Sequence, residues 1–536
     1  MSRCFIWRAV LLTGVCCLMP VIVEIARAQS SPTHGDWGDQ RDGSYVNPIL
    51  PMDFSDLDAI RVGTDYYAIS STIQFSPGMV VLRSKDLVNW TMIGHVVPDL
   101  TRLDPNLNWD KMDQYGKGVW VGSLRFHDGK FWVYFNVPTA GFFMSTAENP
   151  AGPWTPVRNL WKVEGWDDPC PFWDDDGQGY LVATNFSDGY KIHLFKLSAD
   201  GMSLLRDSDQ VIHQSKGSEA NKLYKINGTY YHLYSDVRKE GRVLNMNRSR
   251  SLSGPWETKQ LIHVNRQVDK EPNQGGLMEL PSEKWFFFTH QGTGDWEGRA
   301  GVLLPVTWIS GWPVIGQVGE DGIGRMIWRG AKPIAGFPLT SVTRNDDFGQ
   351  RFLAPEWEWN HQPRPGKWSL MERPDFLRLY AFPALHTGDF WTIGNVLTQR
   401  SIRTKQSEVT VKLELAGMAE GQEAGLVHFA QSYCTFGVAQ VGGVRRIVYN
   451  QGGQLARGPE ISGKTLWLRS TWDYGGQSQF AYSLDGKRFV AFGQSYGLTW
   501  GRFRGDRIGL FTVNQTGKDG YIDVDWLRYE AARTGS

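Results

Sequence analysis

Three acidic residues of this 536-residue chain, Asp56, Asp168 and Glu219, are of a type and spacing that could perform general acid–base chemistry together. Each stands at the start of a predicted strand, in the stretches DFSDLDAIRVG, WDDPCPFWDDDG and GSEANKLYKINGTYY, and they are separated by 112 and then 51 residues. A carboxylate at a strand end is equally well explained as an edge residue in contact with water. The three acids therefore carry chemistry only if the fold brings these strand ends together.

Five segments of the sequence share one design, an apolar strand, a polar turn and a second strand that opens with aromatic residues. Turn chemistry and alternation predict a β-hairpin for each of them. The second strands begin near Tyr66, Phe131, Tyr180, Tyr230 and Trp285, at intervals of 65, 49, 50 and 55 residues. That interval leaves room for four strands per repeat. A repeat of this length made only of strands predicts a five-bladed β-propeller, which we expect over residues 44–338.

A second unit follows the predicted propeller. The segment AKPIAGFPLTSVTRNDDF breaks the repeat with prolines and polar residues and indicates a link. Beyond it, alternating strands such as SEVTVKLELAGM and YIDVDWLRYE recur at short spacing without the long repeat. This pattern predicts a β-sandwich of jelly-roll type over residues 345–533. The fold class is therefore all-β, and no helix of ordinary length is expected in either unit.

The predicted propeller gives the three acids a common meeting place. Innermost strands of a propeller converge on its axis, so residues at the starts of these strands in different blades face one another. We therefore expect Asp56, Asp168 and Glu219 to meet at one end of the axis. The fold alone does not decide what they do, because propellers serve as binding scaffolds as readily as enzymes.

Composition narrows the classes of partner. The formal net charge is zero and the isoelectric point is about 7.2. The chain therefore lacks the excess of basic residues that is typical of a nucleic-acid-binding protein. Aromatic residues make up 13% of the chain, with 24 Trp, beside 60 Gly. This mixture suits many short strands joined by tight turns, and it also suits flat ligands such as sugar rings.

Residues 1–28 have the pattern of a secretory signal peptide. Arg3 and Arg8 precede an apolar run broken by Pro20, and ARA at residues 26–28 offers a cleavage site. The run is shorter than the ~20 residues of a membrane-spanning helix. Removal of the segment takes away three of the five cysteines and leaves Cys170 and Cys434, too few for a disulfide framework. We expect a secreted or periplasmic protein without a membrane anchor and stabilised by a large core; its oligomeric state stays open.

The motifs of the chain resemble those of glycoside hydrolase family 43, in the subgroup with a C-terminal concanavalin A-like β-sandwich. NPILPMDFSDLDAIRVGTDYYAISST is similar to the opening blade of that family, DDPCPFWDDDG to its Asp-Pro motif in blade three, and SEANKLYKINGTYY to the motif of its general acid. GVWVGSLRFHDGKFWVYF, GRAGVLLPVTW and GWPVIG match further family segments. These matches cover nearly the whole mature chain in the family's order.

The resemblance implies a role for each acid: Asp56 as general base, Glu219 as general acid and Asp168 as the residue that tunes pKa values and orients the acid. An inverting glycosidase needs a protonated acid near the leaving oxygen and an ionised carboxylate on the opposite face of the sugar, about 6.5–9.5 Å away. A third carboxylate nearby raises the pKa of the acid by like-charge repulsion. Three carboxyls are therefore what the chemistry requires.

Four further residues are expected to bind substrate. By the resemblance, Arg299 clamps sugar hydroxyls and the Asp168 carboxylate, Phe75 lines the pocket, and Trp120 and Arg125 flank the same opening. Core packing is an equal interpretation for the two aromatic residues.

The resemblance requires no cofactor, although some family members hold a structural calcium ion near the axis. The family often has a His before QGG, where this chain has Asn273. His290 is a candidate to replace that imidazole as a metal ligand, and a hydrogen-bonded structural His is the alternative.

We therefore expect a secreted, exo-acting, inverting glycosidase that acts on β-D-xylosyl or α-L-arabinofuranosyl units of plant cell-wall polysaccharides and oligosaccharides, as in xylan degradation. The sequence does not choose between the two sugars. Two alternatives remain open: a non-catalytic carbohydrate-binding propeller with a lectin-like sandwich, and a sialidase-type hydrolase with a Tyr nucleophile. A WD-type propeller lacks support, because its repeats at ~40–45 residues are missing.

Overall fold

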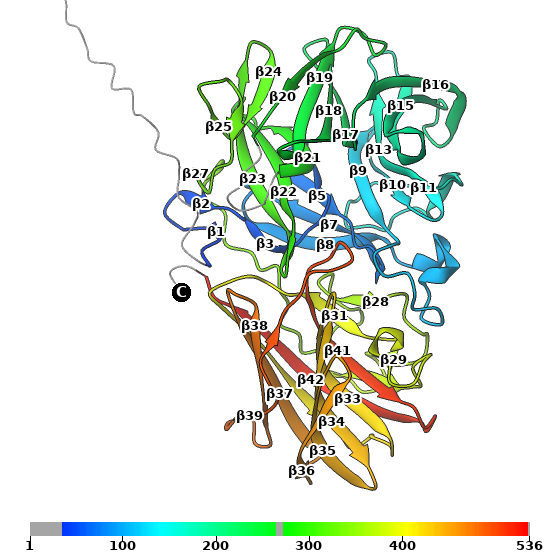
Figure 1. The fold of residues 1–536 in the computed structure, drawn as a ribbon, viewed down its shortest axis with the longest axis vertical. Coiled ribbons are helices and arrows are strands. Elements are labelled where there is room, and N and C mark those ends of the chain that lie inside the picture. The colour runs from blue at the N-terminus through cyan, green and yellow to red at the C-terminus, as the bar shows by residue number, and fades with distance from the viewer. Residues whose placement is uncertain (1–34, 264–271, 534–536) are drawn as a thin grey trace, which may run out of the picture.

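The structure of the protein is a computed structural model that describes residues 35–263 and 272–533. It consists of two β-rich units, a propeller formed by the first part of the chain and a sandwich formed by the second, stacked on each other in Figure 1. Within the described residues the only helices are four short 3-10 turns, η1 (Leu100–Arg102), η2 (Pro105–Leu107), η3 (Phe186–Asp188) and η4 (Phe390–Thr392). No helix in this part of the chain has the length and apolar character needed to cross a membrane.

Five antiparallel sheets of four strands form the blades of the propeller. The first three blades are β4 (Asp58–Val62), β5 (Asp65–Ser70), β7 (Gly78–Ser84) and β8 (Trp90–Val97); β9 (Trp120–His127), β10 (Lys130–Val137), β11 (Gly141–Ala147) and β12 (Arg158–Trp161); and β13 (Trp166–Trp173), β14 (Gly179–Asn185), β15 (Lys191–Leu197) and β16 (Leu204–Gln214). The last two are β17 (Glu219–Ile226), β18 (Thr229–Arg238), β19 (Gly241–Ser249) and β20 (Glu257–Gln260); and β21 (Pro272–Glu279), β22 (Trp285–Asp295), β23 (Gly298–Ile309) and β24 (Trp312–Ile315).

The predicted five-bladed propeller is confirmed. The second strand of every blade begins within one residue of its predicted position. The first strands of neighbouring blades contact one another around the ring, and β21 contacts β4, so the ring closes. Closure is reinforced by β3 (Leu50–Asp53), which precedes the first blade and pairs antiparallel with β23 of the last. Outside the blades, small sheets join β1 (Gly38–Asp39), β2 (Ser44–Val46) and β27 (Arg329–Ala331), and β25 (Gln317–Val318) with β26 (Gly324–Arg325).

The predicted sandwich is confirmed as well, and consists of two large antiparallel sheets. One sheet contains β28 (Glu358–Asn360), β31 (Leu397–Arg400), β33 (Gln422–Phe429), β34 (Tyr433–Val441), β35 (Val444–Gln451), β36 (Gln454–Ile461) and β41 (Arg507–Asn514). The other contains β29 (Trp368–Ser369), β30 (Leu377–Ala381), β32 (Gln406–Glu414), β37 (Thr465–Asp473), β38 (Gln477–Ser483), β39 (Val490–Ala491), β40 (Tyr496–Gly497) and β42 (Gly520–Ala531). A propeller strand, β6 (Phe75–Ser76), pairs with β28 and extends the first sheet.

The two units share one hydrophobic core, which includes Trp90 and Phe288 of the propeller and Trp472 of the sandwich. The rings of Trp90 and Phe288 stack at 4.7 Å. Cys170 and Cys434 are both buried and free, so no disulfide joins them. Stability in the described residues therefore comes from apolar burial and from polar contacts across the interface.

A buried ion cluster lies at this interface. Glu358 of β28 is fully buried: its Oε1 accepts from Arg400 Nη2 at 2.9 Å and lies 3.2 Å from His95 Nε2 of the propeller, and its Oε2 accepts from Arg507 Nη1 at 2.6 Å. Burial alone raises a carboxyl pKa, yet the two guanidinium groups hold the pKa of Glu358 well below its usual range. Arg400 also donates through Nε to the backbone oxygen of Asp53, at 2.7 Å. The cluster thus fixes the sandwich against the strand that precedes the first blade.

We predict that Glu358→Gln lowers the free energy of unfolding by about 3–5 kcal/mol, because the change leaves buried guanidinium groups without their counter-charge. Glu257→Gln is the matched control: this carboxylate pairs with Arg248 but is 67% exposed, so its loss costs about 1 kcal/mol or less. Chemical denaturation of the three proteins measures the difference. Equal losses in both variants would contradict the assigned role of the cluster.

Candidate active site

The starts of the innermost strands carry a repeated irregularity of the backbone. Asp56, Asp168, Ala220 and Gln274 all adopt left-handed conformations, with φ of 57°, 53°, 67° and 53°. In β13, β17 and β21 the register with the next strand also shifts at this point. Non-glycine residues in this region cost about 1–3 kcal/mol each and cluster at functional sites. The bulges redirect side chains at one end of the propeller axis.

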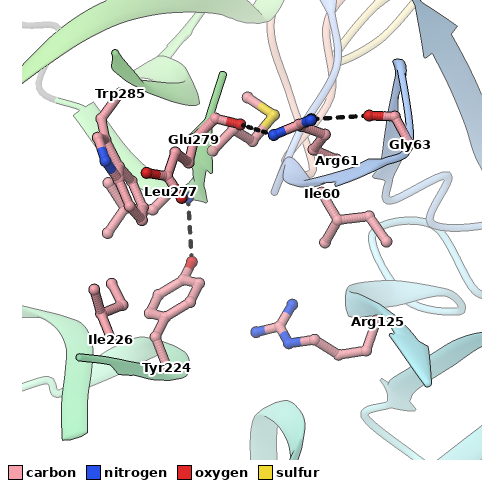
Figure 2. A pocket seen from close by; sticks show the side chains of 10 residues that line it. Ile60, Arg61, Gly63, Arg125, Tyr224, Ile226, Leu277, Glu279 and Trp285 are labelled. Atoms are coloured by element: carbon pink, nitrogen blue, oxygen red, sulfur yellow. Dashed lines mark hydrogen bonds between the residues drawn. The ribbon is translucent and has the colours of Figure 1, made fainter. Parts of the chain in front are cut away.

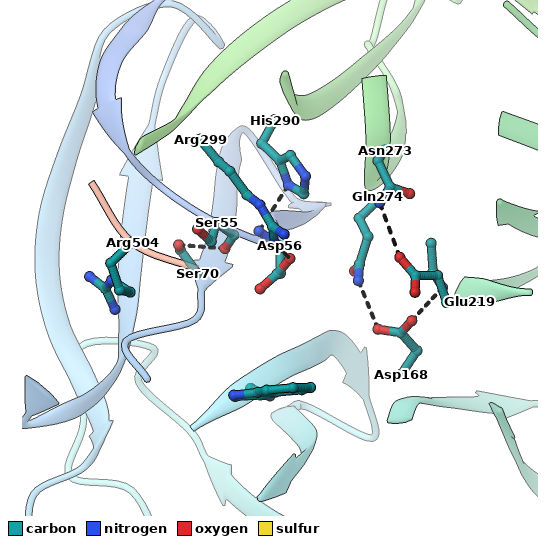
Figure 3. A network of polar contacts seen from close by, with 12 residues as sticks. Ser55, Asp56, Ser70, Asp168, Glu219, Asn273, Gln274, His290, Arg299 and Arg504 are labelled. Carbon is teal, nitrogen blue, oxygen red and sulfur yellow. Dashed lines mark hydrogen bonds and ion pairs between the residues drawn. The ribbon is translucent and has the colours of Figure 1, made fainter. Parts of the chain in front are cut away.

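Asp56 lies in the loop between β3 and β4 and is 7% exposed. Arg299 Nη1 of β23 donates to Asp56 Oδ1 at 2.8 Å, and the backbone N–H of Asp56 donates to His290 Nδ1 of β22 at 2.9 Å. Figure 3 shows these three side chains grouped together. The charged hydrogen bond from Arg299 fixes the orientation of the carboxylate that the sequence predicts to be the general base.

Asp168, in β13, is fully buried. Gln274 Nε2 donates to its Oδ1 at 2.7 Å, and the backbone N–H of Ala220 donates to its Oδ2. Burial, followed by the negative charge of Glu219, raises the pKa of Asp168 to about 7. Because Ala220 directly follows Glu219, the Asp168 carboxylate also fixes the backbone that carries Glu219.

Glu219 opens β17 and is the most exposed of the three acids, with 22% of its side chain accessible. Asn273 Nδ2 donates to Glu219 Oε1 at 3.3 Å, and Arg242 Nη1 lies 3.3 Å from the same oxygen. Figure 3 shows Glu219 and Asp168 side by side, with Gln274 reaching Asp168 from the neighbouring strand. Its partial exposure leaves the Glu219 carboxyl accessible to a molecule bound at this end of the propeller.

The structure therefore brings the three predicted acids to one place. Asp56 belongs to one group with Arg299 and His290, while Asp168 and Glu219 form a second group (Figure 3). The negative charges of both Glu219 and Asp56 act on Asp168, which places all three carboxyls within electrostatic reach of one another. Carboxyl groups in such unlike surroundings can take different roles in acid–base chemistry.

Two of the predicted substrate-binding residues lie at the same end of the axis. Arg299 contacts Asp56, whereas the sequence led us to expect Asp168 as its carboxylate partner. Trp120, the first residue of β9, donates its indole N–H to Gly116 O at 3.0 Å and meets Phe503 edge-on at 5.5 Å. Trp120 is partly exposed, so it retains a surface for a ligand.

Phe75 does not lie where we predicted. It is 1% exposed in β6, with Arg504 and Arg507 at 4.8 and 4.2 Å from its ring centroid and Phe429 at 6.1 Å. The expectation that it lines the pocket is wrong, because pairing of β6 with the sandwich draws this aromatic into the interface. Phe75 instead supports Arg504, whose Nε lies 2.8 Å from Asp53 Oδ2.

Arg125 also lies away from the predicted opening. It comes near the end of β9, five residues after Trp120, where Nη1 donates to Asp58 Oδ2 and Nη2 donates to Cys170 Sγ, each at 2.8 Å. Together with Tyr224 and Trp285 it lines a separate cavity of about 390 Å³, shown in Figure 2. A strand advances about 3.3 Å per residue, so five residues carry Arg125 to the other end of the inner strands.

A loop of the sandwich contributes residues that the sequence did not single out. Between β40 and β41, the guanidinium of Arg299 lies 6.0 Å from the ring centroid of Trp500, and Phe503 is 49% exposed beside Trp120. Arg504 of the same loop is buried against Asp53. In the sequence these residues stand out only as two aromatic side chains, Trp500 and Phe503, in a glycine-rich stretch. Nothing in that stretch indicates that it contacts the other domain.

The residues around His290 do not fit the calcium ion that the family resemblance implies for some members. Its Nδ1 accepts the Asp56 N–H, and burial together with the charge of Arg299 lowers its pKa well below the usual range, so the imidazole is neutral. Calcium takes six to eight oxygen ligands, and the described residues hold no group of three His, Cys, Asp or Glu side chains that could bind a metal. The Lys222 ammonium is buried close enough to lower the pKa of His290 as well. The fixed positive charge of Lys222 disfavours binding of a metal cation at the same place.

Comparison with known proteins agrees with this geometry. The model of glycosyl hydrolases family 43 matches residues 45–313, and that of the beta-xylosidase C-terminal concanavalin A-like domain matches residues 345–530. The chain belongs to glycosyl hydrolase family 43. It is therefore a glycoside hydrolase.

Relatives and solved structures cover most of the chain. A beta-xylosidase of Formosa agariphila is 36% identical over 95% of this chain and 93% of its own. A non-reducing end alpha-L-arabinofuranosidase of Bacteroides ovatus is 31% identical over 63% of this chain and 65% of its own. The structure of a bifunctional GH43-CE protein of Bacteroides eggerthii has a TM-score of 0.82 at 28% identity and covers 94% of this chain, which spans 64% of that longer protein.

The buried carboxyl next to Asp168 gives a prediction about pH and stability. Burial and the charge of Asp168 raise the pKa of Asp167 well above its ordinary value. Between about pH 4 and the raised pKa the folded protein holds a proton that the unfolded chain has lost, so this group makes folding less favourable as pH rises. Asp167→Asn removes that contribution while still accepting the Asp168 N–H.

We therefore expect the Tm of Asp167→Asn minus that of the parent to be larger at pH 8 than at pH 5. Thermal unfolding at both pH values measures this difference. Asp519→Asn is the control, because Asp519 is 91% exposed and its replacement should change neither value. A difference that shrinks with rising pH would contradict burial of an uncompensated acid at this position.

Proposed function

We propose that this glycoside hydrolase is an inverting, exo-acting enzyme that removes terminal xylosyl or arabinofuranosyl units from plant cell-wall oligosaccharides, without a cofactor. The observation that carries the proposal is the pairing of Asp56 with Arg299 in one group and of Glu219 with Asp168 in another. These two groups supply an ionised carboxylate and a proton donor near one another, which is what inversion requires.

In the proposed reaction the glycosidic oxygen lies at Glu219 and the anomeric carbon faces Asp56. Glu219 gives its proton to the leaving oxygen as the bond from the anomeric carbon breaks. A water molecule attacks the opposite face of the sugar and gives its proton to Asp56, so one bond breaks, one forms and the configuration inverts. Exchange with solvent then returns a proton to Glu219 and removes one from Asp56.

Asp168 prepares Glu219 for this role in two ways. Its carboxylate accepts the backbone N–H of Ala220, which orients the start of β17. When it is ionised, its negative charge disfavours ionisation of Glu219, because two neighbouring carboxylates repel each other. Asp168 is thus a positioning residue that need not touch the reacting atoms.

The two candidate sugars rest on the relatives. The relative that matches this chain almost end to end is named a beta-xylosidase, which makes the β-xylosyl unit the first candidate. The arabinofuranosyl unit is the second, because the Bacteroides ovatus relative is named for that sugar. The two sugars present similar hydroxyl patterns, so one pocket can discriminate between them by small differences in contact.

Exo action is supported by the loop between β40 and β41. Trp500 lies against Arg299 and Phe503 against Trp120, so a sandwich loop stands at one side of the catalytic end of the propeller. A site bounded on one side accepts a chain terminus more easily than the middle of a chain. Release of single sugars from an oligosaccharide, followed by chromatography, tests this proposal; early release of internal fragments would contradict it.

We further propose that the protein is secreted or periplasmic. The support is the pattern of residues 1–28, which lie outside the described residues. Expression of the whole chain and N-terminal sequencing of the exported protein tests this proposal. We expect a start at Gln29, and retention of the protein in the cytoplasm would contradict it.

The assigned roles predict different responses to leaving-group chemistry. Glu219→Gln should lower kcat on an oligosaccharide about 10²–10⁴-fold, since no proton reaches the leaving oxygen, but should retain much more activity on an aryl glycoside with an acidic phenol. Asp56→Asn should lower kcat on both substrates to a similar extent, because the attacking water is no longer activated.

Steady-state kinetics of the two variants on both substrates measures these effects, with circular dichroism to verify folding. Glu257→Gln, at the exposed surface, should behave like the parent. Near-normal turnover of the oligosaccharide by either active-site variant, or a reversed pattern between them, would contradict the assignment.

Stereochemistry and sugar preference are tested together. We expect hydrolysis of an aryl β-xyloside, and proton NMR of the first minutes of reaction should show the α anomer of xylose appearing first. First release of the β anomer would contradict inversion. A higher kcat/KM for an aryl α-arabinofuranoside would assign the second candidate sugar instead.

A further inference from the structure

Lys222 is a buried amine that the proposed mechanism does not use. It lies in β17, three residues after Glu219, and its side chain has no exposure to solvent. Its Nζ makes no hydrogen bond to any described residue. Lysine is among the residues least often fully buried, and a buried charge without a partner is strongly disfavoured. This ammonium therefore requires a physical explanation.

The neighbours of Lys222 in the strand have structural partners of their own. Asn221 Nδ2 donates to Thr184 Oγ1 at 2.9 Å, and Leu223 packs in the apolar cluster between the third and fourth blades. The register shift of β17 falls between Glu219 and Lys222, in the same bulge that redirects the catalytic end of the strand. Lys222 thus lies where the register of β17 shifts, two residues after Ala220, whose backbone N–H contacts Asp168.

The positive charge of Lys222 acts on two groups of the active site. It lowers the pKa of Asp168, against the effects of burial and of Glu219, and it lowers the pKa of His290. The ammonium is therefore within electrostatic reach of both β13 and β22, on either side of its own strand.

Each of the three acids is then matched with one cation. Asp56 pairs with Arg299 and Glu219 with Arg242. Within the described residues, Asp168 receives hydrogen bonds from the Gln274 amide and the Ala220 N–H, which are both uncharged groups. Lys222 supplies the missing positive charge at longer range.

Buried acceptors without a hydrogen-bond partner also occur on the neighbouring blade. Asn273 Oδ1 and Gln274 Oε1 of β21 and Gln291 Oε1 of β22 are buried and have no hydrogen-bond partner among the described residues. Asn273 and Gln274 are the residues that contact Glu219 and Asp168. Ordered water can bridge buried donors and acceptors of this kind.

We propose that the Lys222 ammonium is the built-in cation of the catalytic centre, which supports the ionised form of Asp168 and makes a metal ion at the propeller axis unnecessary. The proposal rests on the proposed function, because it assigns a purpose to the ionised Asp168. Lys222 is a positioning residue: it acts on Asp168 and does not touch the substrate. A divalent ion at this place would meet a fixed positive charge and, in the described residues, no cluster of carboxylate or imidazole ligands.

The test compares Lys222→Met, which removes the charge but keeps the length, with Lys222→Arg, which keeps the charge. Loss of the Lys222 charge favours the protonated form of Asp168, which lies in one group with Asp56, Asp167 and Glu219, while His290 is neutral and Arg299 remains charged. We expect the acidic limb of the kcat/KM profile to move to higher pH by about one unit in Lys222→Met, with kcat about 10- to 100-fold lower. In Lys222→Arg the limb should stay in place.

Lys225→Met is the matched control. Lys225 stands on the same strand and pairs with Asp175 at 2.8 Å, away from the three acids. This variant should leave the pH profile unchanged even if it lowers Tm. A role of Lys222 in folding alone would lower the active fraction of Lys222→Met without moving the acidic limb, and that result would overturn the proposal.

Metal dependence is measured separately from activity. The Tm of the parent protein should not change on treatment with EDTA or on addition of calcium chloride, and elemental analysis should find no stoichiometric metal. A bound equivalent of metal together with a Tm that falls in EDTA would overturn the proposal whether or not the protein hydrolyses glycosides. Absence of glycosidase activity with a metal-insensitive Tm would instead contradict the proposed function.

Discussion

Mutual repulsion of carboxyl groups is the constraint around which the catalytic end of the propeller is built. Asp56, Asp167, Asp168 and Glu219 lie near one another, and burial makes their negative charges more costly. The fold offsets this cost locally: Arg299 contacts one acid, Arg242 another, and amide or backbone N–H groups contact a third. The cations and neutral donors are distributed unevenly over the acids, so each acid lies in a different electrostatic environment, as acid–base chemistry by a pair of carboxyls requires.

The conformation of the backbone also helps to position these acids. Left-handed residues recur at or beside the three candidate acids in blades one, three, four and five, and bulges accompany them in β13, β17 and β21. Such conformations are tolerated only where the surroundings determine them firmly. The closed ring of blades, the pairing of β3 with β23 and the buried Glu358 cluster provide that rigidity. The sandwich therefore helps to hold the candidate active site in place, and its loop at Trp500 lies beside Arg299 of that site.

Much of this arrangement could be predicted from the sequence, because repeats and alternation are local signals. The repeated hairpins predict the number of blades, and convergence of inner strands brings the three acids together. Directions of single side chains were harder to predict. Arg125 lies on the predicted strand, β9, but at the end opposite to the candidate active site. Phe75 lies in the interface between the two units, because β6 pairs with β28 of the sandwich. The roles of Lys222 and of the Trp500 loop could not be predicted from the sequence, because their neighbours in the fold belong to other blades or to the other unit.

The central claim is that Asp56 and Glu219 act on opposite faces of one sugar. The most direct measurement is a crystal structure of Glu219→Gln with an unhydrolysed oligosaccharide. The account predicts that the terminal sugar lies between the two positions, with the introduced amide at the glycosidic oxygen and a water molecule held by Asp56 on the other face. A sugar bound instead in the cavity near Arg125, or one with both side chains on the same face, would contradict it.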